Sequence, residues 1–183
     1  MSDQRITAIA ADGSRYPIDK LEAHARDVPH LAVSVFVSCD DRLLLQQRAA
    51  GKYHSGGLWA NTCCSHPAWD ERVEDCASRR LAEELGITVP LVPIGTVRYR
   101  SRVPSRSPTA LYENELAFCF HGRMDAAAVP PSVAADEVMA VEWLRFADVL
   151  QAVEARPERF TSWFRIYLRD HRSMLEPLFR PTS

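Results

Sequence analysis

The sequence predicts a mixed α/β fold of the α+β kind, in a single compact domain covering residues 1–183. Apolar strand-like segments alternate with a few helical segments in one short chain, which is the pattern of such folds. A chain of 183 residues suits one domain, which buries roughly 70% of its unfolded surface and needs no disulfide or zinc to fold. With 46% apolar and 25% charged residues, the composition is that of an ordinary globular protein.

The first quarter of the chain indicates a strand, a short helix and a hairpin. Residues 6–10 (ITAIA) form the strand, which ends in the turn sequence ADGS. The segment 21–27 (LEAHARD) has helical character and stops before Pro29. Residues 31–38 (LAVSVFVS) and 42–48 (RLLLQQR) are strand-like and are separated only by CDD, so they predict a hairpin.

The middle of the chain predicts a loop, an extended segment and the strongest helix of the sequence. The glycines of 51–57 (GKYHSGG) favour a flexible loop, and 58–66 (LWANTCCSH) is expected to be extended. The apolar spacing over 72–85 indicates a helix. Gly86 ends it, because glycine is the residue that most often terminates helices.

The second half of the chain predicts three more strands and two helices. Residues 94–101 (IGTVRYRS) and 114–122 (NELAFCFHG) read as strands joined by the loop RVPSRSPTA. Residues 138–144 (VMAVEWL) form a further strand. The helices are expected near 146–155 and 160–170.

Charge and hydropathy limit the classes of function. The net charge of −2 provides no basic field for nucleic acid, and no apolar run approaches the 18 or so residues of a membrane span. The N-terminus MSDQR does not begin like a secretory signal, so we expect a cytoplasmic protein whose partners include neither nucleic acid nor membrane. An odd number of cysteines and the absence of C-x-x-C indicate free thiols.

Two charged residues fall on the apolar side of the 72–85 helix. On a helical wheel, Arg80 and Glu84 lie inside the apolar arc. Burial of either charge is costly unless it has a partner. One interpretation is an i,i+4 ion pair at the helix margin. The other is a polar pocket in which Glu84 holds a cation and Arg80 an anion, as a phosphate ester with Mg²⁺ would require.

Metal-ligand residue types recur two positions apart. Strand residues two apart share a face, so Cys64 and His66 would lie together with Cys63 turned away. Glu113 and Glu115 in YENE would likewise share a face, as solvated side chains at a strand edge or as ligands that a cation neutralises. Three histidines and two glutamates suit an octahedral site for Mn²⁺, Mg²⁺ or Zn²⁺. The candidate ligands are His24, His30, His66, Glu113 and Glu115.

Basic residues recur along the same part of the chain. Each is individually typical of a solvated surface, yet Lys20, Arg48, Lys52 and Arg80 together can line a diphosphate pocket. The segment RAAGK is not a P-loop, because it lacks the required glycine and Ser/Thr spacing.

The stretch from Ser65 to Ile87 resembles the Nudix box, G-x5-E-x7-R-E-U-x-E-E-x-G-U, where U is aliphatic. The chain departs from the box at the opening glycine, which is Ser65, and at the glutamate after the arginine, which is Arg80. That glutamate is one of the metal-binding acids of the box, so its replacement disfavours diphosphate hydrolysis. The matching positions are Glu71, Arg79, Leu81, Glu83, Glu84, Gly86 and Ile87.

A more specific likeness covers the chain from about Lys20 to Trp163, which is similar to the type 1 isopentenyl-diphosphate delta-isomerases. It is carried by KLEAHARDVPHLAVS, RAAGK, WANTCCSHP, RRLAEELG, RYR, YENE and DEVMAVEWLRFADVL, in this order. The resemblance implies Nudix-like mixed β-sheets packed between helices, with a core over 30–165. It also implies an N-terminal extension (1–30) that carries metal ligands, C-terminal helices (146–175), and a monomer or weak homodimer.

The resemblance also implies roles for individual residues. It assigns a tightly bound divalent metal, Mn²⁺, Zn²⁺ or Mg²⁺, to His24, His30, His66, Glu113 and Glu115. The catalytic residues that it implies are Cys64, Glu115 and Tyr99. It implies that Glu84 and the backbone carbonyl of Cys64 bind a Mg²⁺ that accompanies a five-carbon diphosphate substrate. The diphosphate itself faces Lys20, Arg48, Lys52 and Arg80, and the hydrocarbon faces Trp163.

Two other functions remain open from the sequence. A Nudix hydrolase of an organic or nucleoside diphosphate would share the fold, but Arg80 and the paired carboxylates of YENE speak against it. A non-catalytic zinc-binding module would use Cys63, Cys64 and the histidines. Structural zinc sites usually have two Cys/His knuckles, and the sequence offers one.

Overall fold

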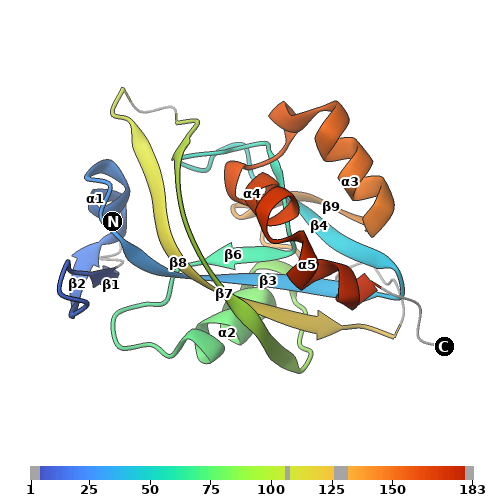
Figure 1. The fold of residues 1–183 in the computed structure, drawn as a ribbon, viewed down its shortest axis with the longest axis horizontal. Helices are drawn as coiled ribbons and strands as arrows, with labels where there is room; N and C mark the ends of the chain where they lie inside the picture. The colour runs from blue at the N-terminus through green and yellow to red at the C-terminus, as the bar shows by residue number, and fades with distance from the viewer. Residues whose placement is uncertain (1–4, 106–107, 126–131, 180–183) are drawn as a thin grey trace.

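The computed structural model describes residues 5–105, 108–125 and 132–179. Within these ranges nine strands hydrogen-bond into one network, and helices cover both of its faces (Figure 1). The mixed α/β class predicted from the sequence is confirmed. Residues 106 and 107 of the predicted loop RVPSRSPTA lie outside the described residues.

A hairpin and a short helix begin the described chain. β1 (Arg5–Ile9) pairs antiparallel with β2 (Arg15–Asp19), and α1 (Lys20–Ala25) follows at once. Asp19 caps the helix, since its carboxylate accepts a hydrogen bond from the backbone N–H of Glu22 at 2.9 Å. β2 was not predicted, because Ile18 is its only buried residue and the strand therefore has no alternation to detect.

The strand β3 (His30–Cys39) is the centre of the fold, and all of its residues are buried. It forms the predicted hairpin with β4 (Arg42–Arg48), in which Cys39 lies opposite Arg42. Beyond this turn the two strands separate, and β4 continues alongside β9 (Val138–Arg145) and β5 (Trp59–Ala60).

The long edges of β3 receive two further strands. β6 (Cys63–Ser65) pairs with β3 in antiparallel orientation, so the predicted extended segment is two short strands, β5 and β6. On its other edge β3 runs parallel to β8 (Leu111–Arg123), which in turn pairs antiparallel with β7 (Leu91–Val103). The parallel register places His30 opposite Glu115.

One face of the network is covered by α2 (Val73–Leu85), which lies at the bottom of Figure 1. The helix starts and ends within a residue of its prediction, and Gly86 ends it with φ of 65° in the left-handed region. At its start, Glu71 accepts two hydrogen bonds from the Arg79 guanidinium, at 2.7 and 2.8 Å. The helix buries its apolar side against the sheet through Cys76, Ala77, Leu81 and Leu85.

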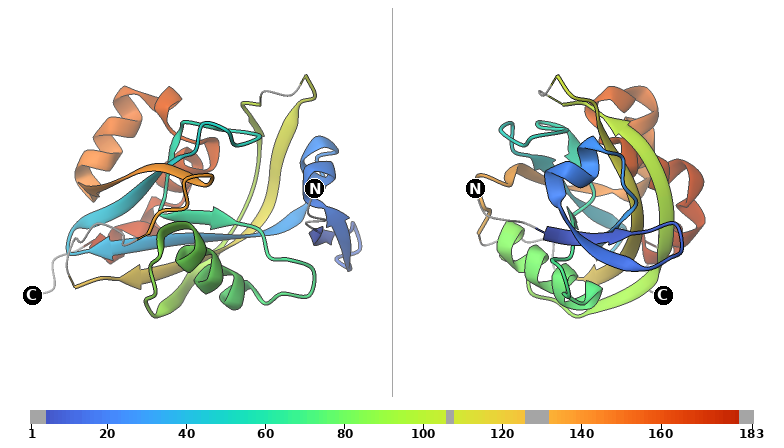
Figure 2. Two further views of the ribbon diagram at one scale, coloured as in Figure 1. Left: turned by 180° about the vertical axis from the view of Figure 1, so that it is seen from behind. Right: turned by 90° about the vertical axis from the view of Figure 1, so that its left-hand side faces the viewer.

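The opposite face is covered by the C-terminal helices (Figure 2). α3 (Phe146–Ala155) and α4 (Ser162–Asp170) lie close to their predicted positions, and the short α5 (Arg172–Leu175) follows. Their aromatic residues join the larger apolar cluster, in which Phe164 and Tyr167 are fully buried. None of the helices described is both long and apolar enough to cross a membrane.

Candidate active site

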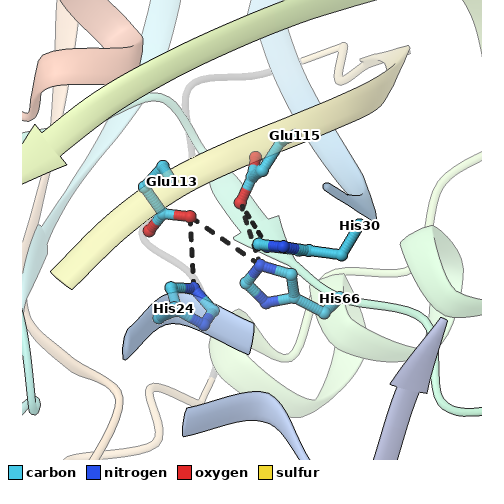
Figure 3. A group of neighbouring side chains, drawn as sticks. All are labelled: His24, His30, His66, Glu113 and Glu115. Atoms are coloured by element: carbon cyan, nitrogen blue, oxygen red, sulfur yellow. Dashed lines mark hydrogen bonds and ion pairs between the residues drawn. The ribbon is translucent and has the colours of Figure 1, made fainter. Parts of the chain in front are cut away.

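Three elements and the residue after a fourth bring together the five residues predicted as metal ligands. His24 comes from α1, His30 from the start of β3, His66 from the residue after β6, and Glu113 and Glu115 from β8. One ligand-type atom from each of the five lies within 4.8 Å of all the others, and all five side chains are buried. Figure 3 shows the two carboxylates projecting from β8 toward the three imidazoles.

Hydrogen bonds to the backbone orient two of the histidines so that their Nε2 atoms face the cluster. The Nδ1 atom of His24 lies 2.6 Å from the carbonyl oxygen of Lys20, and that of His30 lies 2.7 Å from the carbonyl oxygen of Val28. A carbonyl only accepts, so each Nδ1 carries the proton and each Nε2 of a neutral ring presents a lone pair to the cluster. The buried Nε2 of His30 has no hydrogen-bond partner.

The carboxylates complete a donor set that suits a divalent cation. Glu113 Oε2 lies 3.2 Å from His24 Nε2, and Glu115 Oε1 lies 2.9 Å from His66 Nε2. Burial, and then the charge of Glu113, raise the pKa of Glu115 well above its ordinary value. Burial acts the same way on Glu113, but nearby His54 and His24 bring its pKa well below the usual range. A cation would neutralise both carboxylates, and imidazole with carboxylate ligands fits Mn²⁺, Zn²⁺ or Mg²⁺.

The thiol of Cys64 lies in the same pocket as this cluster. It donates a hydrogen bond to Asn61 Oδ1 at 3.0 Å and lies 3.4 Å from Ser34 Oγ. Burial raises the pKa of Cys64 to about 12, so its sulfur holds a proton at neutral pH. Cys63 is fully buried in the apolar cluster beneath α2 and faces away from the pocket.

Tyr99 lies directly across the strand pair from Glu115. The two residues are opposite each other in the β7–β8 ladder, and the Tyr99 hydroxyl donates to Glu115 Oε2 at 2.5 Å. Burial, and then the neighbouring Glu115 charge, raise the pKa of Tyr99 well above its ordinary value, so the hydroxyl keeps its proton. Glu115 therefore presents one oxygen to the histidines and the other to a hydroxyl donor.

The predicted diphosphate residues surround the same pocket. Burial, followed by the charge of Lys52, lowers the pKa of Lys20 to about 8. The guanidinium of Arg48 lies 5.3 Å from the ring centroid of Trp163. The pocket brings together all the predicted catalytic and substrate residues, namely Lys20, Arg48, Lys52, Cys64, Arg80, Glu84, Tyr99, Glu115 and Trp163.

Arg80 and Glu84 form the ion pair that was one of the two interpretations of the helix. Arg80 Nη2 lies 2.7 Å from Glu84 Oε1 and 3.2 Å from Glu137 Oε1. Glu84 Oε2 also accepts a hydrogen bond from the Gln46 amide at 3.2 Å. Because both residues line the pocket, the pair leaves a carboxylate and a guanidinium within reach of a ligand.

Several residues of the site were missed by the sequence reasoning. Tyr53 and His54 line the pocket from the loop that was predicted only as flexible, and Glu137 lines it from the residue before β9. Lys52 lies 2.5 Å from Glu137. Asn61 contacts the Cys64 thiol. Glu137 entered the sequence reasoning only as part of the segment DEVMAVEWLRFADVL, without a role of its own, and the loop histidine gave no signal because glycines on both sides hide any periodicity.

The comparisons with known proteins agree on the fold. A family model described as the NUDIX domain matches residues 28–164. A solved structure from Deinococcus radiodurans superposes with a TM-score of 0.69 at 15% identity, over 90% of this chain and 97% of that one. A MutT protein from Methanosarcina mazei superposes with a TM-score of 0.60 at 19% identity, over 79% of this chain and 94% of that one. At these identities the likeness concerns the fold alone.

The sequence relatives are closer. A protein of Jannaschia sp. named Isopentenyl-diphosphate Delta-isomerase is 49% identical over 165 residues, which cover 90% of this chain and 91% of the relative. A protein of Rhodobacter capsulatus with the same name is 42% identical over 178 residues, which cover 97% and 98%. Identities of this size over nearly the whole length, on a matching domain, define the family. The chain belongs to the isopentenyl-diphosphate Delta-isomerase family and is built on a NUDIX domain.

Proposed function

We propose that this protein interconverts isopentenyl diphosphate and dimethylallyl diphosphate. The observation that carries the proposal is the presence of a protonated thiol, a tyrosine-bound carboxylate and four basic side chains in one pocket, next to the His/Glu cluster. Proteins named for this reaction match nearly the whole chain. The reaction moves a double bond, so it requires proton transfer at two carbons of one bound alkene.

Cys64 and Glu115 are the proposed proton-transfer residues. They come from β6 and β8, which pair with opposite edges of β3, so they approach the pocket from two directions. One group adds a proton to the terminal alkene carbon, which gives a tertiary carbocation. The other removes a proton from the neighbouring methylene on the diphosphate side. The substrate gains and loses one proton, and the two groups pass a proton back before the next turnover.

Tyr99 and Trp163 support this transfer. The Tyr99 hydroxyl bonds to one oxygen of Glu115 and so fixes the carboxylate in place. The buried indole of Trp163 forms an aromatic wall of the pocket. An aromatic ring stabilises a nearby cation by about 0.5–2 kcal/mol. Exclusion of water from the pocket would protect the carbocation from capture.

The metal sites are assigned by the chemistry of their ligands. We assign a tightly bound Mn²⁺, Zn²⁺ or Mg²⁺ to His24, His30, His66, Glu113 and Glu115. We assign the Mg²⁺ that arrives with the diphosphate to Glu84 and the Cys64 carbonyl. When bound, the cations neutralise negative charge and adjust the acidity of the carboxylates. Lys20, Arg48, Lys52 and Arg80 bind the diphosphate and thereby position the alkene. We also expect a cytoplasmic protein that is a monomer or a weak homodimer.

The test is an assay with isopentenyl diphosphate in the presence of Mg²⁺ and Mn²⁺. We expect dimethylallyl diphosphate to form without release of phosphate or inorganic diphosphate. Hydrolysis would be the alternative for a NUDIX domain, but Arg80 occupies the position where the Nudix box has a metal-binding glutamate. Release of phosphate without dimethylallyl product would replace the isomerase proposal with the hydrolase.

A further inference from the structure

His54 lies outside the predicted ligand set but contacts it. Its Nε2 atom lies 2.9 Å from Glu113 Oε1, and its side chain is only 3% exposed. The imidazole stacks on His24, with ring centroids 5.5 Å apart and an interplanar angle of 29°. It also meets the Trp163 ring edge-on at 5.9 Å. His54 therefore fills the space between the His/Glu cluster and the aromatic wall of the pocket.

The two oxygens of Glu113 have separate neighbours. Oε1 faces His54, whereas Oε2 faces the cluster, 3.2 Å from His24 Nε2 and 3.9 Å from His66 Nε2. An ionised carboxylate only accepts hydrogen bonds, so the His54 Nε2–H is the donor. This holds whether the His54 ring is neutral or charged. The contact leaves Glu113 Oε2 directed at the cluster. His54 touches the proposed ligand Glu113 but is not itself one of the five cluster residues.

The loop around His54 holds the imidazole in this position. Its Nδ1 atom lies 3.2 Å from Ser55 Oγ, and its backbone carbonyl accepts a hydrogen bond from Arg48 at 3.4 Å. Ser55 has φ of 52°, a left-handed conformation that is uncommon for a residue other than glycine. Its N–H donates to the Pro104 carbonyl at 2.8 Å. A strained backbone persists where its surroundings determine it and is frequent at functional sites.

We propose that His54 is a positioning residue that sets the affinity of the five-residue cluster for its divalent cation, by holding Glu113 Oε2 in the ligating direction. The inference rests on the metal site assigned above. Outer-shell hydrogen bonds to metal ligands commonly change metal affinity or activity by about 10–100-fold. Loss of the His54 donor would free Glu113 to rotate and would leave Oε1 buried without a partner.

The test measures Mn²⁺ binding to chelator-treated protein by the electron paramagnetic resonance signal of free Mn²⁺. We expect His54→Leu to weaken binding by about 10–100-fold. His54→Gln keeps an N–H donor of similar reach and should stay within about threefold of the original protein. The matched control is His121→Leu, which removes a histidine that hydrogen-bonds Ser38 at 2.8 Å, six residues beyond Glu115 on β8.

The outcomes separate the inference from the proposal on which it rests. Failure of the unsubstituted protein to bind Mn²⁺ would overturn the metal site itself. Tight binding by the unsubstituted protein and by His54→Leu alike would overturn only the role of His54, as would a His54→Gln variant as weak as His54→Leu. If circular dichroism shows that His54→Leu is unfolded, His54→Asn replaces it, because its shorter amide cannot reach Glu113. Recovery of isomerase turnover at high Mn²⁺ concentration would support action through the cation.

Discussion

Two adjacent cysteines have opposite environments in this protein. Successive residues of a strand point to opposite faces, so only one of the pair can reach the pocket. Cys64 does so and donates to Asn61, whereas Cys63 is fully buried in the apolar cluster that includes Leu81 of α2. Cys63 therefore serves as an internal control for Cys64, the thiol that we propose to take part in the reaction.

We expect Cys64→Ala to lower isomerase turnover by about 10²–10⁴-fold, the usual contribution of general acid–base catalysis. Its melting temperature should change little, because Cys64 lies at the edge of the apolar cluster and is only partly buried as a residue. Cys63→Ala should retain turnover and lose about 1 kcal/mol of stability through the small cavity that it leaves. The measurements are dimethylallyl diphosphate formation and thermal unfolding. Inactivity of Cys63→Ala alone would reverse the assignment of the two thiols.

The removal of one predicted ligand tests the cluster directly. Among the three histidines proposed as ligands, His66 lies within 4 Å of both carboxylates, with its Nε2 2.9 Å from Glu115 Oε1 and 3.9 Å from Glu113 Oε2. We expect His66→Ala to lose metal after dialysis, with a loss of affinity beyond the 10–100-fold typical of an outer-shell partner, and to lose activity as a consequence. Elemental analysis measures the metal, and His121→Ala is the control. Stoichiometric metal in His66→Ala would exclude His66 from the ligand set.

Single residues of the site differ in how far the sequence could predict them. The spacing of two predicted a shared face for Glu113 and Glu115, and both are buried on β8. Their pairing with His24 depends on a contact between distant segments, which no local pattern encodes. The residue types suggested a shared site, and the family resemblance assigned these five residues to it. His54 was missed for the same reason, since its contact with Glu113 joins a glycine-rich loop to a strand.

At the scale of elements, periodicity predicted the positions of helices and strands better than it predicted which strands pair. The β3–β4 hairpin, α2, α3 and α4 lie near their predicted positions. The parallel pairing of β3 with β8 was not predicted, because parallel partners lie far apart in sequence and alternation does not specify which strand lies alongside. That pairing aligns His30 with Glu115, and the two strands together supply three of the five residues of the His/Glu cluster.

The end of α2 offers a test of why glycine stands there. Gly86 has φ of 65°, and an added Cβ would lie 3.0 Å from the carbonyl oxygen of Ser132. Gly13 has φ of 83° and nothing within 4 Å of an added Cβ. We expect Gly13→Ala to lower the free energy of unfolding by about 1 kcal/mol, because alanine is strained in a left-handed backbone conformation. Gly86→Ala should lower it by about 2 kcal/mol, because the close contact with Ser132 adds to the same backbone strain. Urea unfolding measures both, and equal losses would rule out a contribution from Ser132.

At the scale of the whole molecule, the described N-terminal part has little apolar core of its own. Its buried cluster comprises Ile6, Ala8, Ile18 and Ala23, whereas the clusters on the two sides of the main sheet are far larger. His24 lies in this part, and the other proposed ligands lie on β3, β8 and after β6. A bound cation would therefore cross-link a weakly packed segment to the stable body of the protein, in addition to the ion pair between Arg100 and Asp27.

Removal of the metal should then destabilise the molecule without unfolding it. A cation present at 1,000 times its dissociation constant stabilises the folded state by about 4 kcal/mol. At about 2–4 °C per kcal/mol for a chain of this size, chelation should lower the melting temperature by roughly 10 °C. Hydrogen exchange should accelerate first at the amides of α1, because the proposed metal ligand His24 lies in that helix. Addition of Mn²⁺ should reverse both changes. In His66→Ala, neither chelation nor added Mn²⁺ should alter the melting temperature or the exchange of α1. Complete unfolding on chelation would instead indicate a structural zinc module. In such a protein the fold itself depends on the metal, so the two large apolar clusters would come apart when the ion is removed.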